Sequence, residues 1–137
     1  EGFADRVTLH DGRARVCLAA SDGALLASGT AALEAALVGC PMVVAYRVSN
    51  LSYRIASTLA STRTVSMPNH LMPIPLVPEF LQQEVNEANL VPAVERLLDD
   101  DVATQKMRKG LSLIQQDLNL DTNARIVDAI LQLARRR

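Results

Sequence analysis

Aromatic residues are scarce in this sequence, which has two Tyr, two Phe and no Trp among its 137 residues. A nucleobase that stacks on an aromatic ring therefore finds few candidates. Long apolar runs are also missing, and none approaches the roughly 18–20 residues of a membrane-spanning helix. The formal net charge is only −1, which gives no support to nucleic-acid binding. These absences argue against a membrane-spanning protein and against a nucleic-acid-binding one.

Cysteine and histidine are equally rare, with two residues of each. Cys17 and Cys40 lie in apolar segments, which is typical of small buried side chains in a protein of the reducing cytoplasm. Their spacing matches neither a disulfide framework nor a metal motif, and His10 and His70 are far apart in the chain. The sequence therefore predicts no metal site and no cofactor.

The composition is that of a folded domain, since 49% of the 137 residues are hydrophobic. The first residues are polar and include no initiator Met, so we expect no signal peptide and a piece of a longer protein. We assign residues 1–137 to a single domain. Within it, residues 86–137 form a helical C-terminal part.

Short apolar segments alternate with helical ones in the first half of the chain. The expected strands are Val7–His10, Gly23–Ala27, Met42–Tyr46 and Thr64–Met67, and the expected helices between them are Arg13–Ala20, Ala31–Val38 and Leu51–Leu59. This alternation favours an α/β fold with a parallel, doubly wound sheet.

Prolines and then helical patterns dominate the second half. Four prolines between Pro68 and Pro78 predict a stiff loop, and Glu79–Gln82 is expected to begin a short helix. The further expected helices are Asn86–Asp99, Val102–Asp117 and Asp121–Arg137. The apolar stripe of the last helix consists of Ile126, Val127, Ile130, Leu131 and Ala134.

A turn of small residues, Ser28-Gly29-Thr30, follows the expected strand Gly23–Ala27. Ligands of open α/β sheets bind beyond the carboxyl ends of the strands, and the N–H groups of a helix N-terminus suit a phosphate. Glu34, about one helical turn further on, can accept hydrogen bonds from a vicinal diol such as a ribose. A hydroxyl-capped helix with a dipole-favoured Glu has the same pattern, so spacing alone leaves both interpretations open.

Three motifs occur together and in order in this chain. They are Ser28-Gly29-Thr30 with Glu34, Pro41-Met42-Val43-Val44 with Tyr46-Arg47, and Pro68-Asn69 with Val77-Pro78-Glu79-Phe80-Leu81-Gln82. In combination they resemble the C-terminal half of lipid-A-disaccharide synthases, a family of GT-B glycosyltransferases of lipid A biosynthesis in Gram-negative bacteria. The resemblance extends from about Val7 to the C-terminus.

The resemblance implies a Rossmann-like parallel sheet flanked by helices, with a helical C-terminal region, as in the C-terminal half of a GT-B fold. It also implies an enzyme that transfers 2,3-diacylglucosamine from UDP-2,3-diacylglucosamine to lipid X, 2,3-diacylglucosamine 1-phosphate, and releases UDP. Such an enzyme is cytoplasmic and contacts the inner membrane peripherally. Its general base is expected in the N-terminal half, so this chain alone is expected to be inactive.

The resemblance also implies that residues 1–137 are a single nucleotide-sugar-binding domain, and it assigns residues to the UDP-sugar. These are Ser28, Gly29, Thr30, Glu34, Arg47, Asn69, Glu79 and Gln82. Glu34 is the ribose candidate, and the turn before it is the diphosphate candidate. Competing structural roles are a turn former at Asn69 and dipole partners of a helix start at Glu79 and Gln82.

One segment departs from the family pattern. Where the family commonly reads Leu-Leu-Ala-Gly-Arg-Glu-Leu, this chain reads His70-Leu71-Met72-Pro73-Ile74-Pro75-Leu76. A charged contact from this loop to the substrate is therefore in doubt, and Arg47 or His70 are the candidates to replace it.

Two other functions remain open from the sequence. One is a non-catalytic α/β assembly module, in which Ser28-Gly29-Thr30 only caps a helix. The other is a different GT-B transferase or epimerase that uses a UDP-sugar. Whatever the function, the last helix of a GT-B protein usually packs across the other domain. Without that domain its apolar stripe faces water unless it finds a partner, so we expect a homodimer.

Overall fold

A three-stranded parallel sheet lies at the centre of the computed structural model, which describes residues 3–27, 29–49, 64–119, 126–127, 130–132 and 134. The strands are β1 (Ala24–Leu26), β2 (Met42–Tyr46) and β3 (Glu79–Leu81), in the spatial order β1-β2-β3. In this register Val44 of β2 lies between Leu26 and Glu79. The predicted α/β class with a parallel sheet is confirmed.

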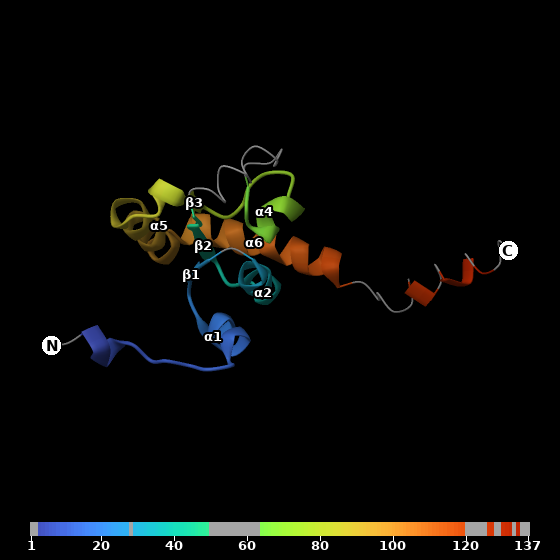
Figure 1. Cartoon of the computed structure of the whole chain (residues 1–137), viewed down its shortest axis with the longest axis horizontal. Coiled ribbons are helices and arrows are strands. Elements are labelled where there is room, and N and C mark those ends of the chain that lie inside the picture. Colours follow the sequence, from blue (N-terminus) through green and yellow to red (C-terminus); the bar gives the residue numbers. More distant parts are fainter. Residues whose placement is uncertain are drawn as a thin grey trace.

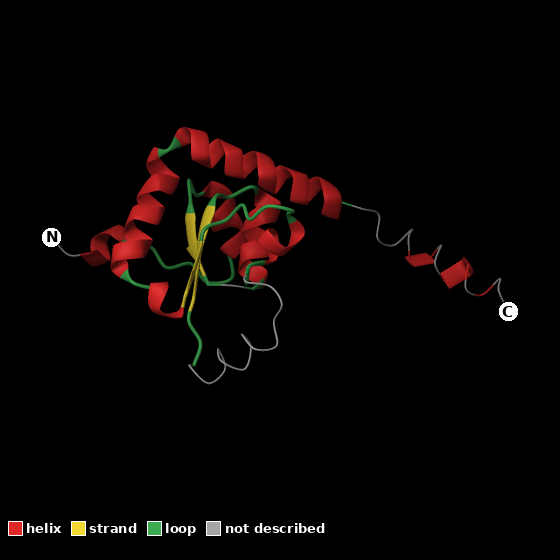
Figure 2. Cartoon of the chain, turned by 90° about the horizontal axis from the view of Figure 1, so that it is seen from above, coloured by secondary structure: helices red, strands yellow, loops and turns green. Residues whose placement is uncertain are grey.

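Helices cover both faces of this sheet. They are α1 (Ala14–Ala20), α2 (Thr30–Val38), α4 (Met67–Leu71), α5 (Glu87–Asp99) and α6 (Asp101–Leu118), with short 3₁₀ helices η1 (Phe3–Arg6) and η2 (Gln82–Glu84). Both cartoons show α5 on one side of the strands and α2 with α4 on the other (Figures 1 and 2). The long helix α6 packs against α2, α4 and α5 and so joins the two layers.

Small side chains allow α2 to lie close to its neighbours. Ala32, Ala35 and Ala36 are fully buried, and alanine also has the highest helix propensity. The helix ends at Gly39, whose φ of 72° is the left-handed conformation that glycine adopts at low cost. The N–H of Cys40 then donates to the carbonyl of Ala35 at 2.9 Å, which closes the last turn.

The core forms where α2 and α5 pack on β2 and α6 packs on both helices. Met42 and Val43 in β2 and Leu111 in α6 are fully buried, as expected for a central strand that is covered on both faces. The backbone N–H of Met42 donates to Sδ of Met107 at 3.3 Å, so α6 also contacts the start of β2 through a hydrogen bond.

Two predicted strands are wrong. Residues 7–10 adopt no regular structure and are exposed, because they have no neighbouring strand to pair with among the described residues. Thr64–Met67 is also no strand: Ser66 precedes α4, and Met67 is the first residue of that helix. The predicted proline loop is accordingly wrong at its start, since Pro68 lies in the first turn of α4, where a missing N–H costs little.

The predicted helix start at Glu79–Gln82 is wrong as well. Glu79–Leu81 forms β3, because Glu79 and Phe80 pair with Val44 and Ala45 of β2, and only then does η2 follow. Glu79 therefore does not lie at a helix start, whereas Gln82 is the first residue of η2.

The other predicted elements are confirmed within one or two residues. The predicted helix Leu51–Leu59 lies outside the described residues. Of the predicted helix Asp121–Arg137, the structure describes only 126–127, 130–132 and 134, which are helical. No described helix combines the length and apolar character needed to cross a membrane.

Candidate functional site

The carboxyl edge of the sheet brings together the end of β1, the start of α2 and the end of β2. Gly29 is the N-cap of α2, with φ of 108° and ψ of −145°, a combination that is essentially confined to glycine. The N-cap residue is a glycine, so no side chain caps this helix start in the described part of the chain, and a capping hydroxyl from Ser28 stays a prediction. Ser28 lies outside the described residues. The N–H groups of this first turn, uncapped by any described side chain, and the positive dipole end of α2 suit an anionic ligand.

Thr30 and Glu34 are both exposed on α2. Residues four apart in a helix lie on one face, so the hydroxyl and the carboxylate flank the same surface at the first turn. Glu34 forms no hydrogen bond or ion pair with a residue that the structure describes. Its carboxylate is therefore available to a ligand.

Arg47 directly follows β2 and is exposed. Because β2 pairs in parallel with β1, the backbone of Arg47 lies at the same edge as the turn that leads into α2. The structure thus places Gly29, Thr30, Glu34 and Arg47 at or near one edge, with their polar groups uncommitted.

Gln82 has a different environment. The residue is only 4% exposed, and both polar atoms of its side-chain amide bond to the backbone of Val48. Oε1 accepts from the N–H of Val48 at 2.8 Å, and Nε2 donates to the carbonyl of Val48 at 3.0 Å. Gln82 is therefore committed to an internal contact.

Asn69 is buried and also internally bonded. Its Nδ2 donates to the carbonyl of Val77 at 2.8 Å and to Oε1 of Glu79 at 2.6 Å. Its Oδ1 accepts from the N–H groups of Leu76 and Val77 at 2.7 and 2.9 Å. A side chain with this many partners holds the loop before β3 in place.

Glu79 completes this network from the first residue of β3. Oε2 accepts from the N–H of Val65 at 2.8 Å, and Oε1 accepts from the N–H of Ser66 at 3.1 Å and from its hydroxyl. Sequence reasoning missed Ser66, which is fully buried. Its position directly before a proline-containing first turn was the available signal.

The segment that departs from the family pattern is largely exposed. His70 lies within 3.3 Å of the Thr64 hydroxyl through Nδ1, and Ile74 is 75% exposed.

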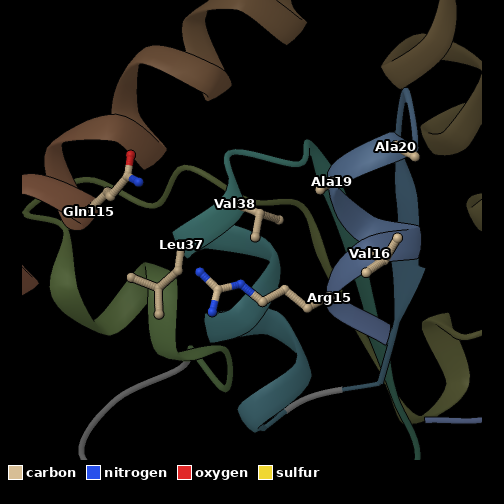
Figure 3. A pocket seen from close by; sticks show the side chains of 7 residues that line it. All are labelled: Arg15, Val16, Ala19, Ala20, Leu37, Val38 and Gln115. Carbon is tan, nitrogen blue, oxygen red and sulfur yellow. The ribbon is translucent and has the colours of Figure 1, made fainter. Parts of the chain in front are cut away.

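A shallow hollow lies elsewhere, between α1, the end of α2 and α6. Its lining is mainly apolar and comprises Arg15, Val16, Ala19, Ala20, Leu37, Val38 and Gln115 (Figure 3). Leu37 and Val38 belong to the last turn of α2, whereas Gly29 and Thr30 mark its start. The hollow is therefore separate from the edge described above.

The two cysteines are free thiols, Cys40 buried and Cys17 partly exposed. Burial raises the pKa of the Cys40 thiol, and the nearby positive charge of Arg108 only partly offsets this. Within the described ranges, no group of three or more His, Cys, Asp or Glu side chains is placed to hold a metal ion.

Comparison with known proteins agrees with the motifs. A family model described as Lipid-A-disaccharide synthetase matches residues 4–131. The lipid-A-disaccharide synthase of Klebsiella pneumoniae subsp. pneumoniae is 41% identical over 129 residues, which are 94% of this chain and 34% of that protein. That of Yersinia pestis is 42% identical over 130 residues, or 95% of this chain and 33% of that protein. No solved structure was found to match.

The chain spans about a third of the length of the curated relatives that it matches. The match nevertheless covers almost all of this chain, including the edge with Gly29, Glu34 and Arg47 and the network around Glu79. On this basis the chain belongs to the lipid-A-disaccharide synthetase family.

Proposed function

We propose that this chain is the UDP-sugar-binding part of a glycosyltransferase that makes the lipid A disaccharide. The donor is UDP-2,3-diacylglucosamine, the acceptor is lipid X, and UDP is released in the cytoplasm. The family match over residues 4–131 carries this proposal. The uncommitted polar groups at the carboxyl edge of the sheet support it, because that edge is where α/β folds bind nucleotides.

Each residue of the edge has a distinct task in this proposal. Gly29 lets the diphosphate approach the first turn of α2, whose N–H groups stabilise the charge that develops on the leaving UDP. Glu34 accepts hydrogen bonds from the ribose hydroxyls. Arg47 supplies the positive charge that is missing from the loop at Ile74, where this chain departs from the family pattern. The base that activates the acceptor hydroxyl is contributed by another part of the whole enzyme.

Calorimetric titration of the 137-residue chain with UDP tests this function. We expect Glu34→Gln to weaken UDP binding about tenfold or more, because a hydrogen bond to an ionised acceptor contributes about 1.5–3 kcal/mol. Glu95→Gln is the matched control, since Glu95 is exposed on α5, across the sheet from α2. CDP and ADP, titrated in parallel, test whether the base is read.

If neither the unsubstituted chain nor the Glu34→Gln variant releases heat with UDP, the proposal is refuted. That outcome would favour the assembly module, in which the start of α2 serves only the fold. Binding that is equally tight for all three nucleotides would favour a transferase or epimerase of another specificity.

We also propose that the chain forms a homodimer and that the whole enzyme contacts the membrane peripherally. The described residues Ile126, Val127 and Ile130 are more than half exposed, at 51%, 53% and 59%. An apolar helix face of this kind gains free energy when it is covered by a second copy.

A further inference from the structure

The contact between Gln82 and Val48 continues the pairing of β2 and β3 beyond the end of the ladder. The last paired residues are Tyr46 and Leu81. Gln82 follows Leu81, and its side-chain amide takes the place of a backbone peptide group. Oε1 accepts from the N–H of Val48 at 2.8 Å, and Nε2 donates to the carbonyl of Val48 at 3.0 Å. The two bonds hold the N–H and the carbonyl of one residue at once.

The backbone of Gln82 is unusual as well. Its φ is 52°, and it is the only non-glycine residue with a positive φ in the described part of the chain. A left-handed conformation is unfavourable for a residue with a Cβ and persists only where surrounding contacts enforce it. Here the buried side-chain amide bonds to Val48, and the Gln82 carbonyl accepts from the N–H of Val85 at 3.2 Å, so contacts on both the side chain and the backbone hold this conformation.

These bonds restrict the backbone around Arg47. Both of its chain neighbours are held: Tyr46 pairs with Leu81 of β3, and Val48 is bonded to the side-chain amide of Gln82, the first residue of η2. The exposed Arg47 therefore projects from a backbone that is fixed on either side. Fixing the backbone reduces the entropy that the guanidinium loses when it binds an anion.

We propose that Gln82 is a positioning residue of the nucleotide site, which acts through Val48 on Arg47 and does not touch the nucleotide. This inference rests on the proposed function, since it assumes that Arg47 faces UDP. It assigns Gln82 a role that differs from substrate contact, and the two roles predict different energetic coupling.

A double-mutant cycle on the 137-residue chain separates these roles. Gln82→Glu keeps the size and the acceptor but cannot donate to the Val48 carbonyl, and Gln82→Gly removes the amide together with the backbone strain. Each is combined with Arg47→Ala, and UDP binding is measured for all variants. Gln83→Glu is the control, because Gln83 is the exposed neighbour in η2.

We expect both Gln82 substitutions to weaken UDP binding about fivefold alone and less than about twofold when Arg47 is already alanine, because coupled residues are non-additive. Amide hydrogen exchange at Val48 should become faster in both variants, while Gln83→Glu leaves binding and exchange unchanged. If the glycine variant does not fold, Gln82→Glu carries the cycle alone.

Additive losses would overturn the inference in favour of direct contact, and so would unchanged exchange at Val48. If the unsubstituted chain binds UDP and Glu34→Gln weakens binding, but the cycle is additive, only this inference fails. If the unsubstituted chain does not bind UDP, the proposed function fails and the inference fails with it.

Discussion

Asn69 donates its side-chain amide to Oε1 of Glu79 at 2.6 Å, and this contact joins α4 to the first residue of β3. Around it, Asn69 holds the backbone at Leu76 and Val77, and Glu79 holds the backbone at Val65. The pair therefore closes the segment between residues 65 and 79 into one hydrogen-bonded unit beside the sheet.

Removal of the Asn69 side chain should destabilise the protein. Asn69→Ala leaves the N–H groups of Leu76 and Val77 and the carboxylate of Glu79 with fewer partners in a buried site, so we expect a loss of about 2–4 kcal/mol in unfolding free energy. Urea denaturation measures it. The exposed Asn89, whose side chain donates to the Glu84 carbonyl, is the control, and Asn89→Ala should cost less than about 1 kcal/mol. Equal losses would contradict the role of the network.

Gly29 and Gly39, which lie at the two ends of α2, form a matched pair for substitution. A Cβ at Gly29 or Gly39 meets no atom within 4 Å, so alanine at either position acts through the backbone alone. We expect Gly29→Ala and Gly39→Ala each to cost about 1–3 kcal/mol in stability. Only Gly29→Ala should also weaken UDP binding, since Gly39 lies at the far end of the helix. Weaker binding in both variants would show that binding follows stability.

Cys40 should resist thiol reagents, whereas Cys17 should react. Burial raises the pKa of Cys40 and leaves less thiolate, the reactive form, at alkaline pH. Since the unfolded thiol loses its proton at lower pH than the folded one, Cys40 also makes stability fall as pH rises above the ordinary thiol value. Modification followed by mass spectrometry checks the first point, and urea unfolding of Cys40→Ala across alkaline pH checks the second. Rapid labelling of folded Cys40 would contradict both.

The apolar stripe at the C-terminus predicts concentration-dependent association. Light scattering after size exclusion should give the mass of a dimer for the unsubstituted chain and of a monomer for Ile130→Asp, because a charge at a covered apolar face is unfavourable. Gln132→Asp adds the same charge beside the stripe and should leave the dimer intact. A monomer mass for the unsubstituted chain at all concentrations would exclude the dimer.

Local pattern was sufficient for part of this structure. The continuous apolar run Met42–Tyr46 predicts β2 with its observed bounds, because a central parallel strand is buried on both faces. The start of α2, with Gly29 and Glu34, follows from turn and helix spacing. These features depend on residues that are close in the chain.

The errors arise where distant contacts decide. Glu79 after a proline has the pattern of a helix start, yet pairing with Val44 makes it the first residue of a strand. Asn69 and Gln82 carry motifs that fit a ligand site equally well. Only their partners, such as Val77 and Val48, show that both side chains hold the backbone.

The chain separations of these contacts suggest an order of folding. The bonds from Glu79 to Asn69 and Ser66 span 10 and 13 residues, the bond from Gln82 to Val48 spans 34, and that from Met42 to Met107 spans 65. Loop-closure entropy rises with span, so local contacts form before distant ones are favourable. We therefore expect the 65–79 unit to form early and the contact of α6 with β2 at Met107 to form late.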